Sequence, residues 1–333
     1  MKKAISILII SFLFIFISIN HKKTTNIENK LFRFIKYNRK NIIIDYKEEK
    51  ILSILNKVKS FKEKNNNIIS YKKIKALYSR YIGQKIAHAK YCIFLDCDDI
   101  VLEDGFFQSY NHIIKYNLDI VQFLSIWQTK DSIFLFTDTY KYTRIIYKPI
   151  LSYIFYYDYH SRKGTASNTM LWDKLVKIEI VKKAFEFIGD SYLKKNIIIH
   201  NDIILLFSIF QIANSYQHIN AIGYFYIENN EKSTHNSWKN PKKRNRIIDS
   251  FILNIQFLYE KTIDTYLDHL YCIFRIKNYF KHYKSLFINL NNSQYYKIKN
   301  LIDKIFNLNY LSIEDKLNLK KMELFILNMK NNN

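Results

Sequence analysis

The sequence predicts an α/β fold, in which helices flank a sheet that contains parallel strands. Two apolar runs with the length of a buried strand, 41–45 and 91–96, each end on an aspartate. Between them, residues 70–90 place apolar side chains at steps of three and four, which is the spacing of one helix face. Strands separated by a helix in this way form βαβ units with parallel strands and right-handed crossovers.

The same alternation continues along the chain. Residues 106–123 have the pattern of a helix followed by a strand, and 124–165 are strand-like and aromatic. The remaining expected elements are a strand or turn and then a helix that stops at Gly189 (168–189), an apolar helix (200–215), a strand (219–228) and a polar loop (229–245). From Arg246 onward, apolar residues fall at helical spacing, so we expect a helical C-terminal extension over 241–333.

The composition predicts a folded, basic chain with one catalytic-sized domain and an appendage. The 333 residues are 48% apolar and 17% aromatic, well above what a disordered chain carries. A formal net charge of +23 comes from 52 Lys and Arg against 29 Asp and Glu. Because this excess is spread along the chain without an Arg-rich stripe, we expect no nucleic-acid partner. A surface binder that uses the lysine excess is retained as a competing hypothesis.

Glycine and cysteine usage excludes several enzyme classes. Five glycines without a glycine-rich motif provide no dinucleotide-binding turn and no P-loop. The three cysteines, Cys92, Cys97 and Cys272, leave at least one thiol unpaired and form no zinc signature.

The first 20 residues predict a signal peptide or signal anchor. Lys2 and Lys3 precede an apolar run from 4 to 19, which suits a signal core and is slightly short for a full membrane span. This predicts a membrane-anchored protein or one in the secretory pathway, with the cytoplasmic side left open. The alternative is that 14–19, FIFISI, is the first strand of the folded domain, in which case the chain has no targeting signal.

Negative charge gathers where the strand 91–96 ends. Asp96, Asp98 and Asp99 fall within four residues, and their carboxylates repel one another unless a cation lies among them. Oxygen ligands select a hard ion such as Mg²⁺ or Mn²⁺, which completes its shell with water and phosphate oxygens. Ligands of open α/β sheets bind outside the carboxyl ends of the strands. The alternative is a solvated turn between strand and helix.

The residues before these acids resemble the family 2 glycosyltransferases. The stretch SRYIGQKIAHAKYCIFLDCDD, 79–99, matches that family's pattern without a gap at Arg80, Gly83, Ala87 and Tyr91 and in the D-x-D-D motif of 96–99. It departs from the family at Tyr81 and Ala89, where Asn and Gly are usual. The resemblance covers roughly 27–238 and implies a GT-A-type, Rossmann-like mixed sheet flanked by helices. It places a glycosyltransferase-like domain at 21–240.

The resemblance also implies roles for individual residues. Asp96 and Asp98 would hold Mn²⁺ or Mg²⁺ against the donor diphosphate, and Asp202 would be the catalytic base. The nucleotide-sugar donor would contact Asp45, Arg80 and Asp96, and the acceptor region would contain Asp99, Trp172 and His235. Alternatives stay open for two of them: Arg80 braces carboxylates rather than phosphate or is an ordinary surface arginine of its helix, and Asp202 is the N-cap of the apolar helix.

These observations predict a metal-dependent, inverting glycosyltransferase. It would move a sugar from a nucleotide-diphosphate donor to a hydroxyl of a glycan, lipid or protein acceptor, with membrane association as a further expectation. The alternative is a catalytically inactive relative that keeps the fold and binds a glycan or another partner. It is motivated by the departure at Tyr81 and by the stretch DYKEE at 45–49, which replaces the family's usual acidic pair followed by Gly-Ser. A third motive is the first strand, whose only candidate lies inside the predicted signal segment.

Overall fold

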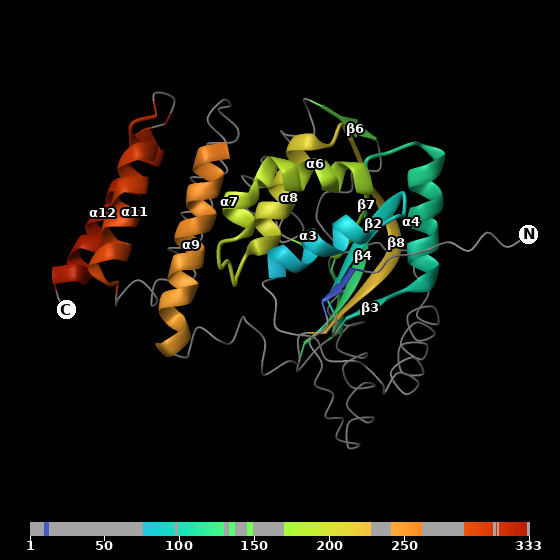
Figure 1. Ribbon diagram of the computed structural model, residues 1–333, viewed down its shortest axis with the longest axis horizontal. Coiled ribbons are helices and arrows are strands. Elements are labelled where there is room, and N and C mark those ends of the chain that lie inside the picture. The colour runs from blue at the N-terminus through green and yellow to red at the C-terminus, as the bar shows by residue number, and fades with distance from the viewer. Residues whose placement is uncertain are drawn as a thin grey trace, which may run out of the picture.

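The computed structural model describes residues 10–12, 76–96, 99–129, 133–136, 145–148, 170–227, 241–261, 290–308, 311 and 313–331. Within these ranges, an eight-stranded mixed sheet has helices on both faces, and three C-terminal helices stand beside one of the helical layers (Figure 1). This architecture confirms the predicted mixed α/β class. The predicted strand 41–45 lies outside the described residues.

The elements follow one another in the alternating order that the sequence predicts. The strands are β1 (Ile10–Phe12), β2 (Tyr91–Asp96), β3 (Ile100–Val101), β4 (Ile120–Gln128), β5 (Ile133–Phe136), β6 (Ile146–Tyr147), β7 (Lys174–Lys177) and β8 (Ser215–Ile227). The helices are α3 (Ala76–Ile86), α4 (Glu103–Lys115), α6 (Ile178–Ile188), α7 (Asp190–Leu193), α8 (Asn201–Ile212), α9 (Pro241–Lys261), α11 (Asn292–Phe306) and α12 (Ile313–Asn331).

The strand order places one antiparallel strand between parallel ones. The order is β1-β2-β7-β4-β8-β3, with β5 beside β4 and β6 beside β8. The pairs β1/β2 and β4/β8 are parallel, whereas β7 is antiparallel to both β2 and β4. Strands β2, β4 and β8 therefore run in the same direction, and their carboxyl ends meet at one edge of the sheet. This edge is where a ligand site is expected in an open α/β sheet.

Part of the N-terminal apolar run belongs to this sheet. Ile10–Phe12 pairs in parallel with Phe94–Asp96, just ahead of the run 14–19 that the first-strand alternative used. The pairing therefore favours a strand in this segment, and the signal or anchor stays a prediction. No helix in the described ranges is long and apolar enough to cross a membrane.

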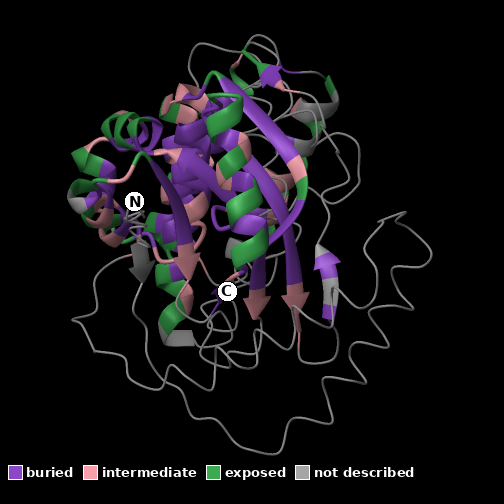
Figure 2. Cartoon of the chain, turned by 90° about the vertical axis from the view of Figure 1, so that its right-hand side faces the viewer, coloured by how far each residue is buried: buried purple, intermediate pink, exposed green. Residues whose placement is uncertain are grey.

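Side-chain alternation along the strands builds a core on each face of the sheet. In β4, Val121 and Phe123 pack toward α4, whereas Ile120 packs toward the face covered by α3, α6 and α8. Figure 2 shows the strands largely buried and an exposed outer side on the helix nearest the viewer. Cys92 lies in the core on the face covered by α3, α6 and α8, and burial raises the pKa of its thiol to about 12. The thiol is therefore not a nucleophile near neutral pH.

Helix α4 packs unusually close to β8 at a glycine. A Cβ atom on Gly105 would lie 1.9 Å from the backbone oxygen of Ile222, so only glycine fits there. A Cβ atom on Gly223, the next residue of β8, would lie 2.6 Å from the ring of Phe123. These two glycines set the distance between helix and sheet just behind the strand-end acids.

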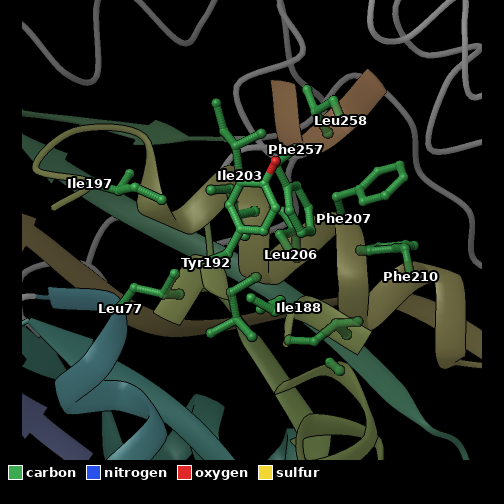
Figure 3. Packing of buried hydrophobic residues seen from close by; sticks show 14 of the residues in the cluster. Leu77, Ile188, Tyr192, Ile197, Ile203, Leu206, Phe207, Phe210, Phe257 and Leu258 are labelled. Carbon is green, nitrogen blue, oxygen red and sulfur yellow. The ribbon is translucent and has the colours of Figure 1, made fainter. Parts of the chain in front are cut away.

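The C-terminal helices continue the core of the α/β domain. Helix α8 is apolar on all sides because it lies between α6 and α9. Figure 3 shows Phe207 of α8 near Tyr192 and Phe257, whose ring centroids are 5.0 Å apart. The described residues beyond 240 are largely helical, as predicted, but α9 begins at Pro241 inside the predicted loop. Proline suits this first helical position because its missing N–H has no intrahelical partner there. The predicted domain boundary at 240 stays a prediction.

Candidate functional site

The strand-end acids form a tight turn at the carboxyl end of β2. The strand ends at Asp96, and the backbone N–H of Asp99 donates to the Asp96 carbonyl oxygen over 3.0 Å. The side chains of Asp96 and Asp99 are therefore held close to the sheet edge. Three other predicted site residues, Asp45, Asp98 and His235, lie outside the described residues.

Arg80 joins three elements at this edge. Its Nη1 donates to the side-chain oxygens of Asn201 and Asp202 at the start of α8. Its Nη2 lies 3.6 Å from Oδ1 of Asp96 at the end of β2. Helix α3 thus presents a cation to two carboxylates that are more than one hundred residues apart in the sequence. Three predicted site residues are brought together, and Asn201 is an addition that the sequence analysis missed.

The charged side chains of this cluster differ in their exposure to solvent. The Arg80 side chain is 6% exposed, whereas those of Asp96 and Asp202 are 37% and 31% exposed. Burial lowers the pKa of Arg80, but the carboxylates of Asp202 and Asp96 outweigh this and raise the pKa above its ordinary value. The guanidinium therefore stays charged beneath the carboxylates. It offsets part of their mutual repulsion while leaving them accessible from solvent.

Helix α8 begins with an unusual backbone conformation. His200 is its N-cap residue with a left-handed φ of 53°, which is uncommon outside glycine. Its side chain forms no cap bond. Because the N-cap is His200 and Asp202 lies within the first turn, the alternative of Asp202 as the N-cap is wrong. A carboxylate at that position is stabilised by the helix dipole. His200 itself lies against Phe251, with ring centroids 5.5 Å apart.

Asp99 is bound to β8. Its Oδ2 accepts a hydrogen bond from the Tyr224 hydroxyl over 2.8 Å, and its Oδ1 accepts one from the backbone N–H of Ile227 over 2.8 Å. The same hydroxyl accepts a bond from the Asp96 N–H over 3.2 Å. Burial, together with the charges of Asp99 and Asp96, raises the pKa of Tyr224 well above its usual range. Tyr224 therefore stays protonated and keeps its donor for Asp99.

Trp172 belongs to an aromatic cluster beside this turn. Its ring is stacked on Tyr224 and Tyr226, with centroids 4.7 and 5.4 Å apart. Trp127, opposite Tyr226 in the parallel pairing of β4 and β8, completes the cluster with a centroid 4.7 Å from Tyr226. Trp172 is only 5% exposed, so most of its surface packs in the core, and Trp127 and Tyr226 form the more exposed rim.

A buried polar network next to Trp172 was missed by the sequence analysis. Nζ of the fully buried Lys174 donates to Oδ1 of Asp173 over 2.6 Å and to the Met170 carbonyl over 2.8 Å. Gln122 donates to the other Asp173 oxygen, and Tyr216 donates to Gln122. Burial raises the pKa of Asp173, and Lys174 opposes that rise. The adjacent opposite charges of the LWDKLVK stretch are the signal that points to such a pair.

The described residues contain no group of three or more His, Cys, Asp or Glu side chains that could hold a metal ion. Asp96 is partly exposed and can supply one carboxylate, whereas both oxygens of Asp99 accept bonds from β8. Magnesium sites often use only one or two protein carboxylates and take their other ligands from water and phosphate. Asp96 therefore fits such a site if Asp98 supplies the second carboxylate.

The mixed sheet flanked by helices is a glycosyltransferase-like fold. The solved structures that resemble it include S. aureus TarS 1–349 in complex with UDP, with a TM-score of 0.50 and 11% identity over 83% of this chain and 75% of that one. A longer S. aureus TarS structure has a TM-score of 0.50 at 11% identity and is matched over 84% of this chain and 45% of its own. No protein-family model and no curated protein sequence matches the chain.

Proposed function

We propose that this protein is a metal-dependent, inverting glycosyltransferase of the family 2 type. It moves a sugar from a nucleotide-diphosphate donor to a hydroxyl of a glycan, lipid or protein acceptor. The observation that carries the proposal is the cluster in which Arg80 binds both Asp96 and Asp202 at the carboxyl edge of the sheet. The likeness to TarS, which was crystallised with UDP, supports a nucleoside diphosphate as part of the donor.

The two carboxylates have different tasks in this proposal. Asp202 accepts the proton of the acceptor hydroxyl while that oxygen attacks the anomeric carbon. Arg80 is a positioning residue, because it holds the Asp202 carboxylate from below and fixes its distance to Asp96. A Mn²⁺ or Mg²⁺ ion bound by Asp96 and Asp98 would neutralise charge on the departing diphosphate. Asp45 remains the predicted contact of the donor base.

The acceptor is proposed to approach from the side of the aromatic cluster. Trp127 and Tyr226 form its exposed rim, next to the turn that Asp99 ties to β8. Trp172 supports these rings from within the core, and His235 stays a predicted contact outside the described residues. A role of the N-terminal segment in membrane association or secretion stays a prediction, and it competes with the pairing of Ile10–Phe12 with β2.

Calorimetric titration with UDP, with and without Mn²⁺, tests donor binding, and a panel of nucleotide-diphosphate sugars tests sugar release and transfer. We expect Asp96→Asn to lose the metal-dependent part of UDP binding. We expect Asp202→Asn to keep UDP binding and to lose transfer by at least about a hundredfold, as removal of a general base does. Asp190→Asn is the matched control, because that carboxylate is 75% exposed and forms an ion pair with Lys194 across one helical turn, on the surface. Unchanged transfer in Asp202→Asn would refute the proposed base.

A catalytically inactive relative that binds a glycan is the second candidate. It is favoured by the stretch DYKEE at 45–49, which departs from the family's usual acidic pair followed by Gly-Ser. Asp99 does not discriminate, because the proposed metal site uses only Asp96 and Asp98. The departure from the family at Tyr81 does not discriminate, since Tyr81 packs edge-on against Phe185 and is explained by the core. This candidate predicts that no nucleotide raises the melting temperature, with or without Mn²⁺.

A further inference from the structure

Helix α12 carries apolar side chains on two opposite sides. One side packs against α11 through Leu319 and Ile326, which are 0% and 2% exposed. The other side points away from the protein: Ile313 is 80% exposed, and the further exposed residues are Leu317 at 55%, Leu324 at 48% and Leu327 at 38%. Figure 1 shows α12 at the outer end of the molecule, far from the sheet.

The exposed residues form one continuous stripe, which we call the outer stripe of α12: Ile313, Leu317, Leu324 and Leu327. Their steps of four, seven and three residues keep all four side chains within an arc of about 80° on a helix with 3.6 residues per turn. A helix that needed only its contact with α11 would carry polar residues on this arc. The outer stripe therefore marks an interaction surface.

Lysines accompany the outer stripe. Lys320 lies within it and its side chain is 58% exposed, while Lys316 and Lys321 flank it on either side. Lys316 also lies over the ring of Phe306, an α11 residue that is itself 36% exposed. The nearest described acid, Glu323, is only 20% exposed and is engaged by Lys320 and Lys299. Among the α12 side chains that the structure describes, those around the outer stripe are thus apolar and basic.

This charge arrangement disfavours a second copy of the chain as the occupant. Lys320 is at the midpoint between Ile313 and Leu327, so two outer stripes paired in antiparallel would bring Lys320 against its own copy. A parallel pairing would place the two lysines at the same level. Like charges enclosed in an apolar contact are costly, because each lysine loses water and gains no partner beyond its existing ion pair with Glu323.

A lipid surface accommodates the same residues. Leucine and isoleucine enter the boundary between headgroups and acyl chains, while lysine stems lie along the apolar surface and keep their ammonium groups among the headgroups. Anionic headgroups complement the lysines, and the formal net charge of +23 adds long-range attraction. We propose that the outer stripe of α12 is a peripheral binding surface for bilayers that contain anionic lipids. This proposal does not depend on the proposed catalytic activity.

The test is flotation of the full-length protein with vesicles. We expect recovery with vesicles of phosphatidylcholine mixed with phosphatidylglycerol, and little with phosphatidylcholine alone. The double variant Leu317→Gln with Leu324→Gln should lower the partition coefficient for anionic vesicles by more than about tenfold, because it removes two leucine side chains that the membrane would bury. Ile114→Gln is the matched control, since Ile114 is 46% exposed on α4 at a distant surface. Circular dichroism and the melting temperature show whether each variant is folded.

A local probe separates α12 from the N-terminal segment. An environment-sensitive fluorophore on Asn328→Cys, in a chain with Cys97→Ser and Cys272→Ser, lies beside the outer stripe. We expect its emission to shift to the blue with anionic vesicles and to be unchanged with neutral ones. Absence of the shift, or equal flotation of the double leucine variant and the wild type, would overturn the proposal. A dimer in light scattering that the double variant abolishes would instead assign the outer stripe to a second copy.

Discussion

Arg80 connects Asp96, at the end of β2, with Asp202, at the start of α8. It is 6% exposed, and its charge is balanced by the carboxylates of Asp96 and Asp202 and by the Asn201 amide oxygen. Two functional tasks were open for this residue from the sequence alone, phosphate binding and bracing of carboxylates. Its observed partners favour bracing, while a contact with donor phosphate remains a prediction. The proposed role of Arg80 is then to position the side chains of Asp96, Asp202 and Asn201.

Substitution Arg80→Gln should destabilise the fold as well as lower activity. The variant leaves two carboxylates close together without the cation between them. Breaking a buried ion pair costs about 3–5 kcal/mol, and the partial exposure of both carboxylates reduces our expectation to about 1–3 kcal/mol. Urea denaturation measures this change in the free energy of unfolding. Arg246→Gln, at an exposed position, is the control, and equal stability of the two variants would contradict the bracing role.

At the scale of elements, the order along the chain was predictable and their pairing was not. The predicted strand at 91–96 is β2, and the predicted helix that stops at Gly189 is α6. By contrast, β7 looked like a strand or a turn and is in fact an antiparallel strand between β2 and β4. In that position Asp173 and Lys174 lie beside β4, whose Gln122 donates to Asp173, which explains why a charged pair can be fully buried.

Substitution Lys174→Met should make stability depend strongly on pH. The variant removes the cation that opposes the burial effect on Asp173, so the folded-state pKa of that carboxyl rises further above its unfolded value. A group with a raised folded-state pKa contributes fully below its unfolded pKa, and its contribution is lost as pH rises through the folded value. The free energy of unfolding, relative to wild type, should therefore be higher at about pH 5 than at about pH 8.

Urea denaturation at the two pH values checks this expectation. Lys182→Met, on the exposed side of α6, is the control and should show no comparable pH dependence. Adding Asp173→Asn to Lys174→Met should remove the pH dependence, because no titrating group then remains in the pair. A single variant whose stability relative to wild type is the same at both pH values would argue against the buried network.

At the scale of the whole molecule, the C-terminal helices complete the core of the α/β domain. The buried cluster runs from the sheet face through α8 to Phe251 and Phe257 of α9, and further to α11 and α12. An independent appendage would leave α8 with a polar side toward α9, yet Ile203 to Phe210 are all buried. The outer stripe of α12, at the far end of the same core, would then hold the whole molecule against a membrane.

A chain that ends at residue 240 should therefore not fold to a soluble monomer. Loss of α9 uncovers the apolar side of α8, including Phe207. We expect aggregation in light scattering and binding of a hydrophobic dye. A chain that ends at residue 312 is the control, because it removes α12 and keeps α9 and α11. A soluble, cooperatively unfolding 1–240 fragment would show that the predicted boundary at 240 separates two independent units.

The sequence by itself determined the class of fold, the helical C-terminal region and the acids at the end of β2, because each depends on local periodicity and on neighbouring residues. The tertiary structure decided which of those acids serve the site. It bound Asp99 to β8, brought Asp202 to Asp96 through Arg80 and left Trp172 mostly in the core. The contacts of Asp202 with Arg80 and of Asp99 with β8 join residues more than one hundred positions apart, so they follow from strand order and helix packing, which no local pattern encodes.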